Sequence, residues 1–124
     1  METPGLNHII MTIKDVKTSQ AFYGELLGFE IKSIADGFFL MTGGVAIFFF
    51  PSNRPIPDDR FSEFRIGLDH LSFTAPSEAA LQSLAGKLKD AGVDTKGVET
   101  YHTGNKYVAF RDPDNIQLEY WLPK

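Results

Sequence analysis

Two histidines and one carboxylate are the residues of this sequence whose types and spacing could bind a metal ion. His8 lies in the segment GLNHIIMTI, and His70 lies in GLDHLSFTA, which repeats the first segment at an offset of 62 residues. Glu119 lies in the final segment IQLEYW. Imidazole and carboxylate groups suit divalent Fe, Mn, Ni, Co or Zn, and three protein ligands leave coordination positions open for a substrate.

Strand alternation predicts that these three residues occupy equivalent faces of a sheet. Side chains on a strand point alternately to its two faces, so residues of equal parity lie together. The faces that carry the candidate ligands hold His8, Ile10 and Thr12; His70, Ser72 and Thr74; and Gln117, Glu119 and Trp121. The opposite faces are wholly apolar and should pack against helices. We therefore expect both histidines and Glu119 to project from the concave side.

The elements that position these residues occur twice, in the order strand, helix, strand, strand, strand. The first copy predicts strands at 6–13, 29–34, 38–41 and 45–50, with a helix that Asp15 caps and that starts near Val16. The second copy predicts strands at 68–75, 93–101, 106–111 and 116–122, with a helix capped by Ser77. The segment RDPDN between the last two strands is a strong turn signal.

The repeat predicts an α+β fold of two tandem βαβββ modules within one domain, residues 1–124. Module one spans 5–50, a proline-rich linker spans 51–66, and module two spans 67–122. One such module cannot close its sheet or cover both of its faces, whereas two can place curved mixed sheets around a cavity. The duplication therefore predicts a metal-binding cavity enclosed by the two sheets.

Composition and charge limit the classes of binding partner and the cellular compartment that we expect. The net charge of −4 disfavours nucleic acid and anionic membranes as partners, and a small-molecule substrate is expected instead. Cysteine is absent, which excludes disulfides and thiolate ligands and fits a reducing compartment. No signal peptide and no apolar stretch of membrane-spanning length is visible in the sequence, so we expect a cytoplasmic protein.

Four segments together resemble the vicinal oxygen chelate superfamily: GLNHIIMTI, SQAFYGELLGFEI, GLDHLSFTA and KYVAFRDPDNIQLEYW. This superfamily includes glyoxalase I, extradiol dioxygenases, fosfomycin resistance transferases and bleomycin-binding resistance proteins. The resemblance implies one divalent metal held by His8, His70 and Glu119, a substrate chelated through vicinal oxygens, and Lewis-acid polarisation of that substrate. It also implies a homodimer, in which the modules can pair within one chain or between chains.

Departures from the family patterns bear on the reaction. Glyoxalase I has a fourth ligand in module one, but aligning the two halves places Ile47, or Phe48 after a shift of one residue, opposite Glu119. Neither side chain can bind a metal, so a site with three protein ligands is favoured. Fosfomycin transferases have a threonine where this chain has Ile10. Extradiol dioxygenases tend to have a tyrosine just before the closing turn, where this chain has Val108, Ala109 and Phe110. The choice between lyase or isomerase chemistry and ring-cleaving dioxygenase chemistry stays open.

The remaining site candidates come from strand parity and composition. Parity counted from Ile47 predicts that Phe49 lines the cavity, and Ser72, Gln117 and Trp121 are its expected partners in the substrate pocket. His102 is either an acid–base residue near the pocket or a surface histidine. We favour a metalloenzyme that acts on an apolar or aromatic, oxygen-bearing molecule. The alternative is a non-catalytic binding protein of the bleomycin-resistance type.

Overall fold

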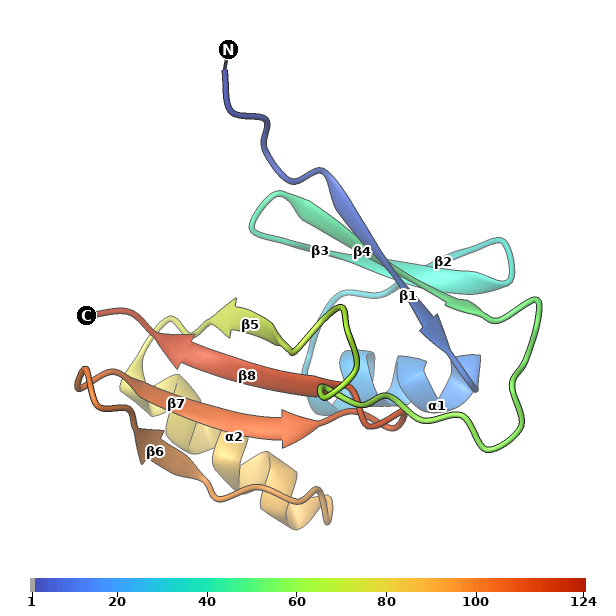
Figure 1. Cartoon of the computed structure of the whole chain (residues 1–124). Helices are drawn as coiled ribbons and strands as arrows, with labels where there is room; N and C mark the ends of the chain where they lie inside the picture. The colour runs from blue at the N-terminus through green and yellow to red at the C-terminus, as the bar shows by residue number, and fades with distance from the viewer. Residues whose placement is uncertain (1) are drawn as a thin grey trace. The chain divides into compact units, whose positions relative to one another are not determined.

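Two compact units make up the computed structural model, which describes residues 2–124 (Figure 1). The first unit extends to Asp59 and the second spans Arg60–Lys124, so the division falls within the proline-rich segment 51–66. Each unit contains strand, helix and three further strands in that order, which confirms the predicted pair of βαβββ modules. No helix within residues 2–124 combines the length and the apolar character needed to cross a bilayer.

The first unit is a four-stranded mixed sheet with a helical segment on one face. Its elements are β1 (His8–Ile13), α1 (Val16–Gln20), the π-helical turn η1 (Ala21–Leu26), β2 (Lys32–Ile34), β3 (Gly37–Thr42) and β4 (Val45–Pro51). The strand order is β1-β4-β3-β2, with β1 parallel to β4 and the other pairs antiparallel. Asp15 caps α1 as predicted, because its carboxylate accepts a hydrogen bond from the Thr18 amide at 2.9 Å.

The pairing of β1 with β4 decides which aromatic residues of this sheet reach its open face. His8 pairs with Ala46, so residues 46, 48 and 50 share the face of His8. Phe49 points to the helical side, where its ring stacks on Phe38 at 4.6 Å and lies 4.5 Å from the ring of Tyr23 in η1. The prediction that Phe49 lines an open cavity is therefore wrong: its side chain is fully buried in the core of the first unit.

The second unit repeats the arrangement with a longer helix. It contains β5 (Leu71–Thr74), α2 (Glu78–Asp90), β6 (Val98–Thr100), β7 (Lys106–Arg111) and β8 (Gln117–Leu122), in the sheet order β5-β8-β7-β6. Strand β5 is parallel to β8, and the other pairs are antiparallel. Ser77 caps α2, as predicted, by accepting a hydrogen bond from the Ala80 amide at 3.1 Å. The buried stripe of α2 is Leu81, Leu84 and Leu88, at the spacing of one helix face.

The edge strand β6 is much shorter than the predicted strand 93–101. A side chain takes over backbone bonding before β6 begins, because the Thr95 hydroxyl donates to the Ala109 carbonyl at 2.8 Å and accepts from the Gly97 amide at 3.1 Å. Gly97 also has a positive φ of 72°, which is incompatible with a continuous strand. Strand β2 is similarly reduced to three residues, since the Phe29 amide still bonds to the Tyr23 carbonyl at the end of η1.

A buried carboxylate fixes the turn between β7 and β8. The Asp112 side chain is 5% exposed and accepts hydrogen bonds from the amides of Asp114 at 2.8 Å and Ile116 at 2.9 Å. Asn115 completes the turn with a φ of +69°, which asparagine tolerates better than most residues. The RDPDN signal therefore marks a turn that holds β7 and β8 in a single register.

The segment that opens the second unit lies against this turn. Asn115 accepts a hydrogen bond from Arg60 at 3.0 Å and donates one to the Phe61 carbonyl at 2.9 Å. Glu63 forms a two-pronged ion pair with Arg111, with N–O distances of 2.5 and 3.0 Å. Paired forks of this kind are stronger and more directional than single contacts.

Two glycines should respond oppositely to alanine. A Cβ on Gly37 would lie 2.0 Å from the Phe49 carbonyl oxygen, so Gly37→Ala should lower the free energy of unfolding by about 2–3 kcal/mol. A Cβ on Gly86 of α2 would meet nothing within 4 Å, so Gly86→Ala should raise it by about 0.5–1 kcal/mol. Urea denaturation of the two variants checks both signs, and equal effects would contradict the close approach at Gly37.

The Glu63–Arg111 pair should contribute a pH-dependent part of the stability. The guanidinium lowers the pKa of Glu63 from 4.5 to about 2 in the folded protein. Because the folded-state pKa is the lower one, the stabilisation is complete above pH 4.5 and disappears as the pH falls towards 2. Glu63→Gln should therefore be less stable than the wild type at neutral pH and converge with it in acid. Urea denaturation across this range tests the expectation, which fails if the difference is independent of pH.

Candidate functional site

The open face of the second sheet presents three rows of side chains, set by strand register. An aromatic row contains Thr74, Trp121 and Tyr107; a central row contains Ser72, Glu119 and Ala109; and a polar row contains Gln117 and Arg111. Glu119 therefore lies between two small side chains, with aromatic rings along one side. Alternation places the apolar residues of β8, such as Leu118, on the opposite face against α2.

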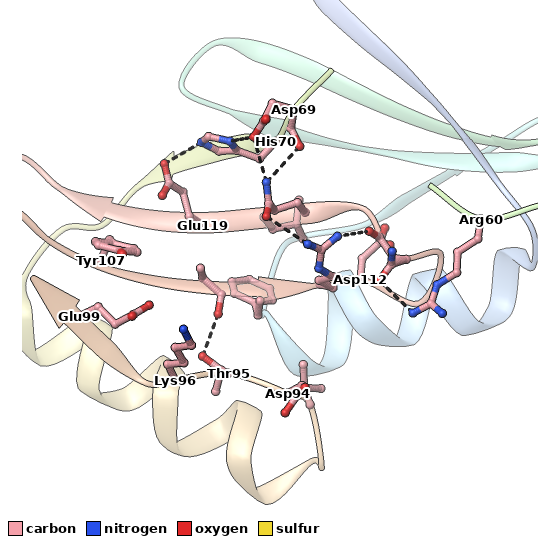
Figure 2. Close-up of a pocket in the computed structure, with 17 residues that line it drawn as sticks. Arg60, Asp69, His70, Asp94, Thr95, Lys96, Glu99, Tyr107, Asp112 and Glu119 are labelled. Carbon is pink, nitrogen blue, oxygen red and sulfur yellow. Dashed lines mark hydrogen bonds and ion pairs between the residues drawn. The ribbon is translucent and has the colours of Figure 1, made fainter. Parts of the chain in front are cut away.

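His70 directly precedes β5 and meets Glu119 on this open face (Figure 2). Its Nε2 atom lies 3.0 Å from Oε1 of Glu119, and its Nδ1 atom lies 2.7 Å from Oδ1 of Asp69. The Glu119 side chain is 17% exposed and that of His70 is 37% exposed, so both remain accessible to a small molecule. The parallel pairing of β5 with β8 thus joins two of the three predicted ligands.

The site has a negative electrostatic character. The hydrogen bond to Asp69 and the charge of Glu119 raise the pKa of His70, against the opposing effect of partial burial. Partial burial also raises the pKa of the Tyr107 hydroxyl, and the charges of Glu99 and Glu119 add to this effect. The carboxylates of Asp69 and Glu119 therefore surround the imidazole of His70 with negative charge.

His8, the third predicted ligand, lies in the first unit, on the open face of that sheet. Its Nδ1 atom is 2.7 Å from Oδ1 of Asn7, and its ring meets that of Phe48 edge-on at 5.8 Å. Within residues 2–124, no three or more His, Asp or Glu side chains form a group that could hold a metal ion. The second unit therefore pairs His70 with Glu119, and His8 belongs to the first unit.

The geometry of the His70–Glu119 pair fits two ligands of one metal ion. With bonds of about 2.1 Å, two adjacent ligand atoms at a right angle around a metal lie about 3 Å apart. The observed separation of Nε2 and Oε1 is 3.0 Å. The carboxylate of Asp69 occupies the other ring nitrogen, as outer partners of metal-binding histidines commonly do.

Two cavities open on either side of this pair. The larger one, about 820 Å³, extends over Ala109 towards Arg111 and Lys96 and has mixed charge (Figure 2). The smaller one, about 440 Å³, is lined by His70, Ser72, Tyr101, Tyr107, Glu119 and Trp121. In the smaller cavity Trp121 stacks on Tyr107 at 5.8 Å, and Tyr101 meets Trp121 edge-on at 5.5 Å. Aromatic rings of this kind offer apolar faces and edges against which a planar apolar group can pack.

Three of the predicted pocket residues line these cavities. Ser72 and Trp121 belong to the smaller cavity and Gln117 to the larger one, although their contact with a substrate stays a prediction. His102 lies in an exposed turn with its ring 4.2 Å from that of Tyr101, and in the described chain, 2–124, it lines neither of these two cavities. Its role as an acid–base residue also stays a prediction.

Register also corrects the alignment of the two halves. Ser72, two residues after His70, pairs with Glu119; Ile10, two residues after His8, pairs with Phe48. The counterpart of Glu119 in the first unit is therefore Phe48, and the alignment with Ile47 is wrong by one residue. The inference that the first unit lacks an equivalent carboxylate is unchanged by this correction.

Sequence reasoning missed Asp69, Tyr101 and Tyr107 as parts of the site. One signal was present: each repeated histidine follows a residue with a short polar side chain, Asn7 or Asp69, and both contact the histidine Nδ1 atom at 2.7 Å. The tyrosines had no comparable signal, because their approach to Trp121 depends on the register of β7 and on the turn before it.

Comparison with known proteins agrees with this architecture. A sequence model of the Glyoxalase/Bleomycin resistance protein/Dioxygenase superfamily matches residues 5–120. YwkD of Bacillus subtilis (strain 168), an uncharacterized protein, is 29% identical over 125 residues, or 94% of each chain.

Solved structures agree as well. A glyoxylase/bleomycin resistance protein/dioxygenase domain from Frankia sp. EAN1pec is 30% identical with a TM-score of 0.83, covering 99% of this chain and 94% of that one. Lactoylglutathione lyase from Agrobacterium tumefaciens, at 18% identity and a TM-score of 0.73 over 98% of this chain and 96% of that one, shares the fold. With the duplicated βαβββ architecture and the family match over nearly its whole length, the chain belongs to the Glyoxalase/Bleomycin resistance protein/Dioxygenase superfamily.

Proposed function

We propose that this protein is a divalent-metal-dependent enzyme that binds an oxygen-bearing, apolar or aromatic small molecule beside His70 and Glu119. The observation that carries the proposal is the 3.0 Å approach of His70 Nε2 to Glu119 Oε1 at the edge of an aromatic-walled cavity. His8 would supply a third ligand, and the metal would be Fe, Mn, Ni, Co or Zn.

The parts of the site suggest distinct tasks. A bound metal would supply Lewis-acid polarisation of the substrate's oxygen atoms. The rings of Trp121 and Tyr107 would contact the apolar part of the substrate. The small side chain of Ala109 would leave space beside Glu119 for the polar end of the substrate. Both lyase or isomerase chemistry and ring-cleaving dioxygenase chemistry begin with such a polarised, oriented substrate, so both remain within the proposal.

The assembly and location are part of the same proposal. By its resemblance to other single-domain members, the protein would act as a cytoplasmic homodimer without nucleic acid or membrane partners. His8 would then come from the same chain as His70 and Glu119, or from a second copy. Both arrangements use the same three side chains.

Metal content tests the ligand set. Protein purified without chelator should contain about one metal ion per set of three ligands, and His8→Ala, His70→Ala and Glu119→Gln should each lower this content at least about tenfold. His102→Ala is the matched histidine control and should keep the metal. Elemental analysis measures the content. Folded wild-type protein that takes up none of the five metals would refute the proposal.

The same variants also locate His8. If the site joins two chains, a mixture of His8→Ala and His70→Ala that exchanges subunits should regain part of the lost metal, because one of its sites is then intact. If the site lies within one chain, mixing should restore nothing.

Trp121 is the only tryptophan in the sequence and lines the smaller cavity, so its fluorescence can report ligand binding there. Catechol, which carries adjacent oxygens on an aromatic ring, should quench Trp121 fluorescence in the metal-loaded protein and bind more weakly to the metal-free protein or to Glu119→Gln. Phenol, with one oxygen, is the matched control ligand and should bind weakly throughout. Equal catechol affinity with and without metal would instead favour the alternative, a binding protein whose aromatic cavity acts alone.

A further inference from the structure

The smaller cavity has two aromatic walls that meet at a steep angle. Trp121 and Tyr107 form one wall, since their rings are inclined by only 25°, with centroids 5.8 Å apart. The ring of Tyr101 forms the other wall. It is inclined at 68° to Trp121 and 76° to Tyr107, with centroids 5.5 and 6.3 Å away. These three rings form an aromatic corner within one cavity.

Carboxylates border the aromatic corner. Strand register places Glu99 beside Tyr107, and Tyr107 beside Trp121, so Glu99 continues the aromatic row onto β6. Glu119 lies two residues before Trp121 on β8 and lines the smaller cavity. Figure 2 shows Tyr107 near both carboxylates. Burial raises the pKa of the Tyr107 hydroxyl, and the charges of Glu99 and Glu119 raise it further, as a negative local potential requires.

Lysine and arginine side chains are missing from the lining of the smaller cavity within residues 2–124. Lys106 is next to Tyr107 in the sequence, but it forms an ion pair with Glu78 of α2. Lys96 lines the larger cavity and not the smaller one. The smaller cavity therefore combines three electron-rich rings with negative charge that no lysine or arginine of its lining offsets.

This combination is complementary to an organic cation. The face of an aromatic ring attracts positive charge, and tryptophan and tyrosine are the rings that alkylammonium groups contact in proteins. The methyl groups of such a cation also pack against apolar surface, whereas an anion would be repelled by Glu119. A volume of about 440 Å³ is in the range of small-molecule pockets.

We propose that the aromatic corner binds an alkylammonium group of a small molecule, with Glu99 and Glu119 supplying the opposite charge. This binding stands on the rings and the carboxylates and needs no metal ion. Its consequence for the substrate rests on the proposed function: the apolar part of the substrate that packs against Trp121 and Tyr107 carries a positive charge.

Choline and 3,3-dimethylbutan-1-ol test the proposal, because they have the same shape and differ by a charged nitrogen in place of a carbon. Trp121 fluorescence measures the affinity of each, in amine-free alkaline buffer that keeps imidazole neutral, before and after treatment with chelator. Choline should bind at least about fivefold more tightly in both preparations. The preference should narrow as salt is added, because salt screens the carboxylates. Equal affinities, or no binding of either ligand, would overturn the proposal.

Substitutions of Tyr101 test the contribution of the ring. Its side chain is 45% exposed, so the fold should tolerate a change there. Tyr101→Leu keeps an apolar side chain but removes the aromatic face, and should weaken choline binding about 3- to 10-fold while changing the affinity of the neutral alcohol less than about twofold. Tyr101→Phe keeps the ring and should bind choline as the wild type does.

A substitution of Glu99 tests the contribution of charge. Glu99→Gln should weaken choline binding about two- to fivefold and leave the affinity of the alcohol unchanged. Asp94→Asn is the matched control, because it removes one negative charge from the lining of the larger cavity alone. A choline preference that survives both Tyr101→Leu and Glu99→Gln would place the binding elsewhere and overturn the proposal.

The outcomes separate this inference from the proposed function. A preference for choline in a protein that takes up no metal would uphold the cation site and refute the metal-dependent enzyme. Metal-dependent binding of catechol without a preference for choline would do the reverse.

Discussion

The parallel pairing of β5 with β8 is the constraint on which the candidate site depends. It brings together His70 and Glu119, which are 49 residues apart in the sequence. A slip of one residue would send Glu119 to the helix side and bring Leu118 or Tyr120 to the open face. The leucine stripe of α2 opposes such a slip, because it packs only against the apolar face of the sheet.

The turn at Asp112 fixes the register of β7 against β8. Its buried carboxylate accepts hydrogen bonds from two backbone amides of the turn, and this holds Arg111 opposite Gln117 and Ala109 opposite Glu119. The ion pair between Glu63 and Arg111 then ties the preceding segment to the same turn. One short hairpin therefore organises the central and polar rows of the site.

Local patterns predicted the order of the elements, both helix caps and the faces of His8, His70 and Glu119. These features depend on periodicity and on nearby polar side chains, which are readable along the chain. The face of Phe49 was mispredicted because parity was counted from Ile47, and only the pairing of β1 with β4 shows which residue matches Glu119. The hydrogen bonds from Arg111 to Gln117 and from Gln117 to Asp69 were missed for a related reason. They join distant segments, so predicting them requires the register of β5, β7 and β8.

Each sheet has a buried side that packs against helices and an opposite, open side. In the second unit Val108, Phe110 and Leu118 are buried on the helix side, while Tyr107, Glu119 and Trp121 alternate with apolar residues along the same strands and line the smaller cavity. A substitution on the open side therefore leaves the contacts on the helix side in place. Alternation at a period of two residues thus keeps the contacts that stabilise the fold apart from the side chains that line the cavity.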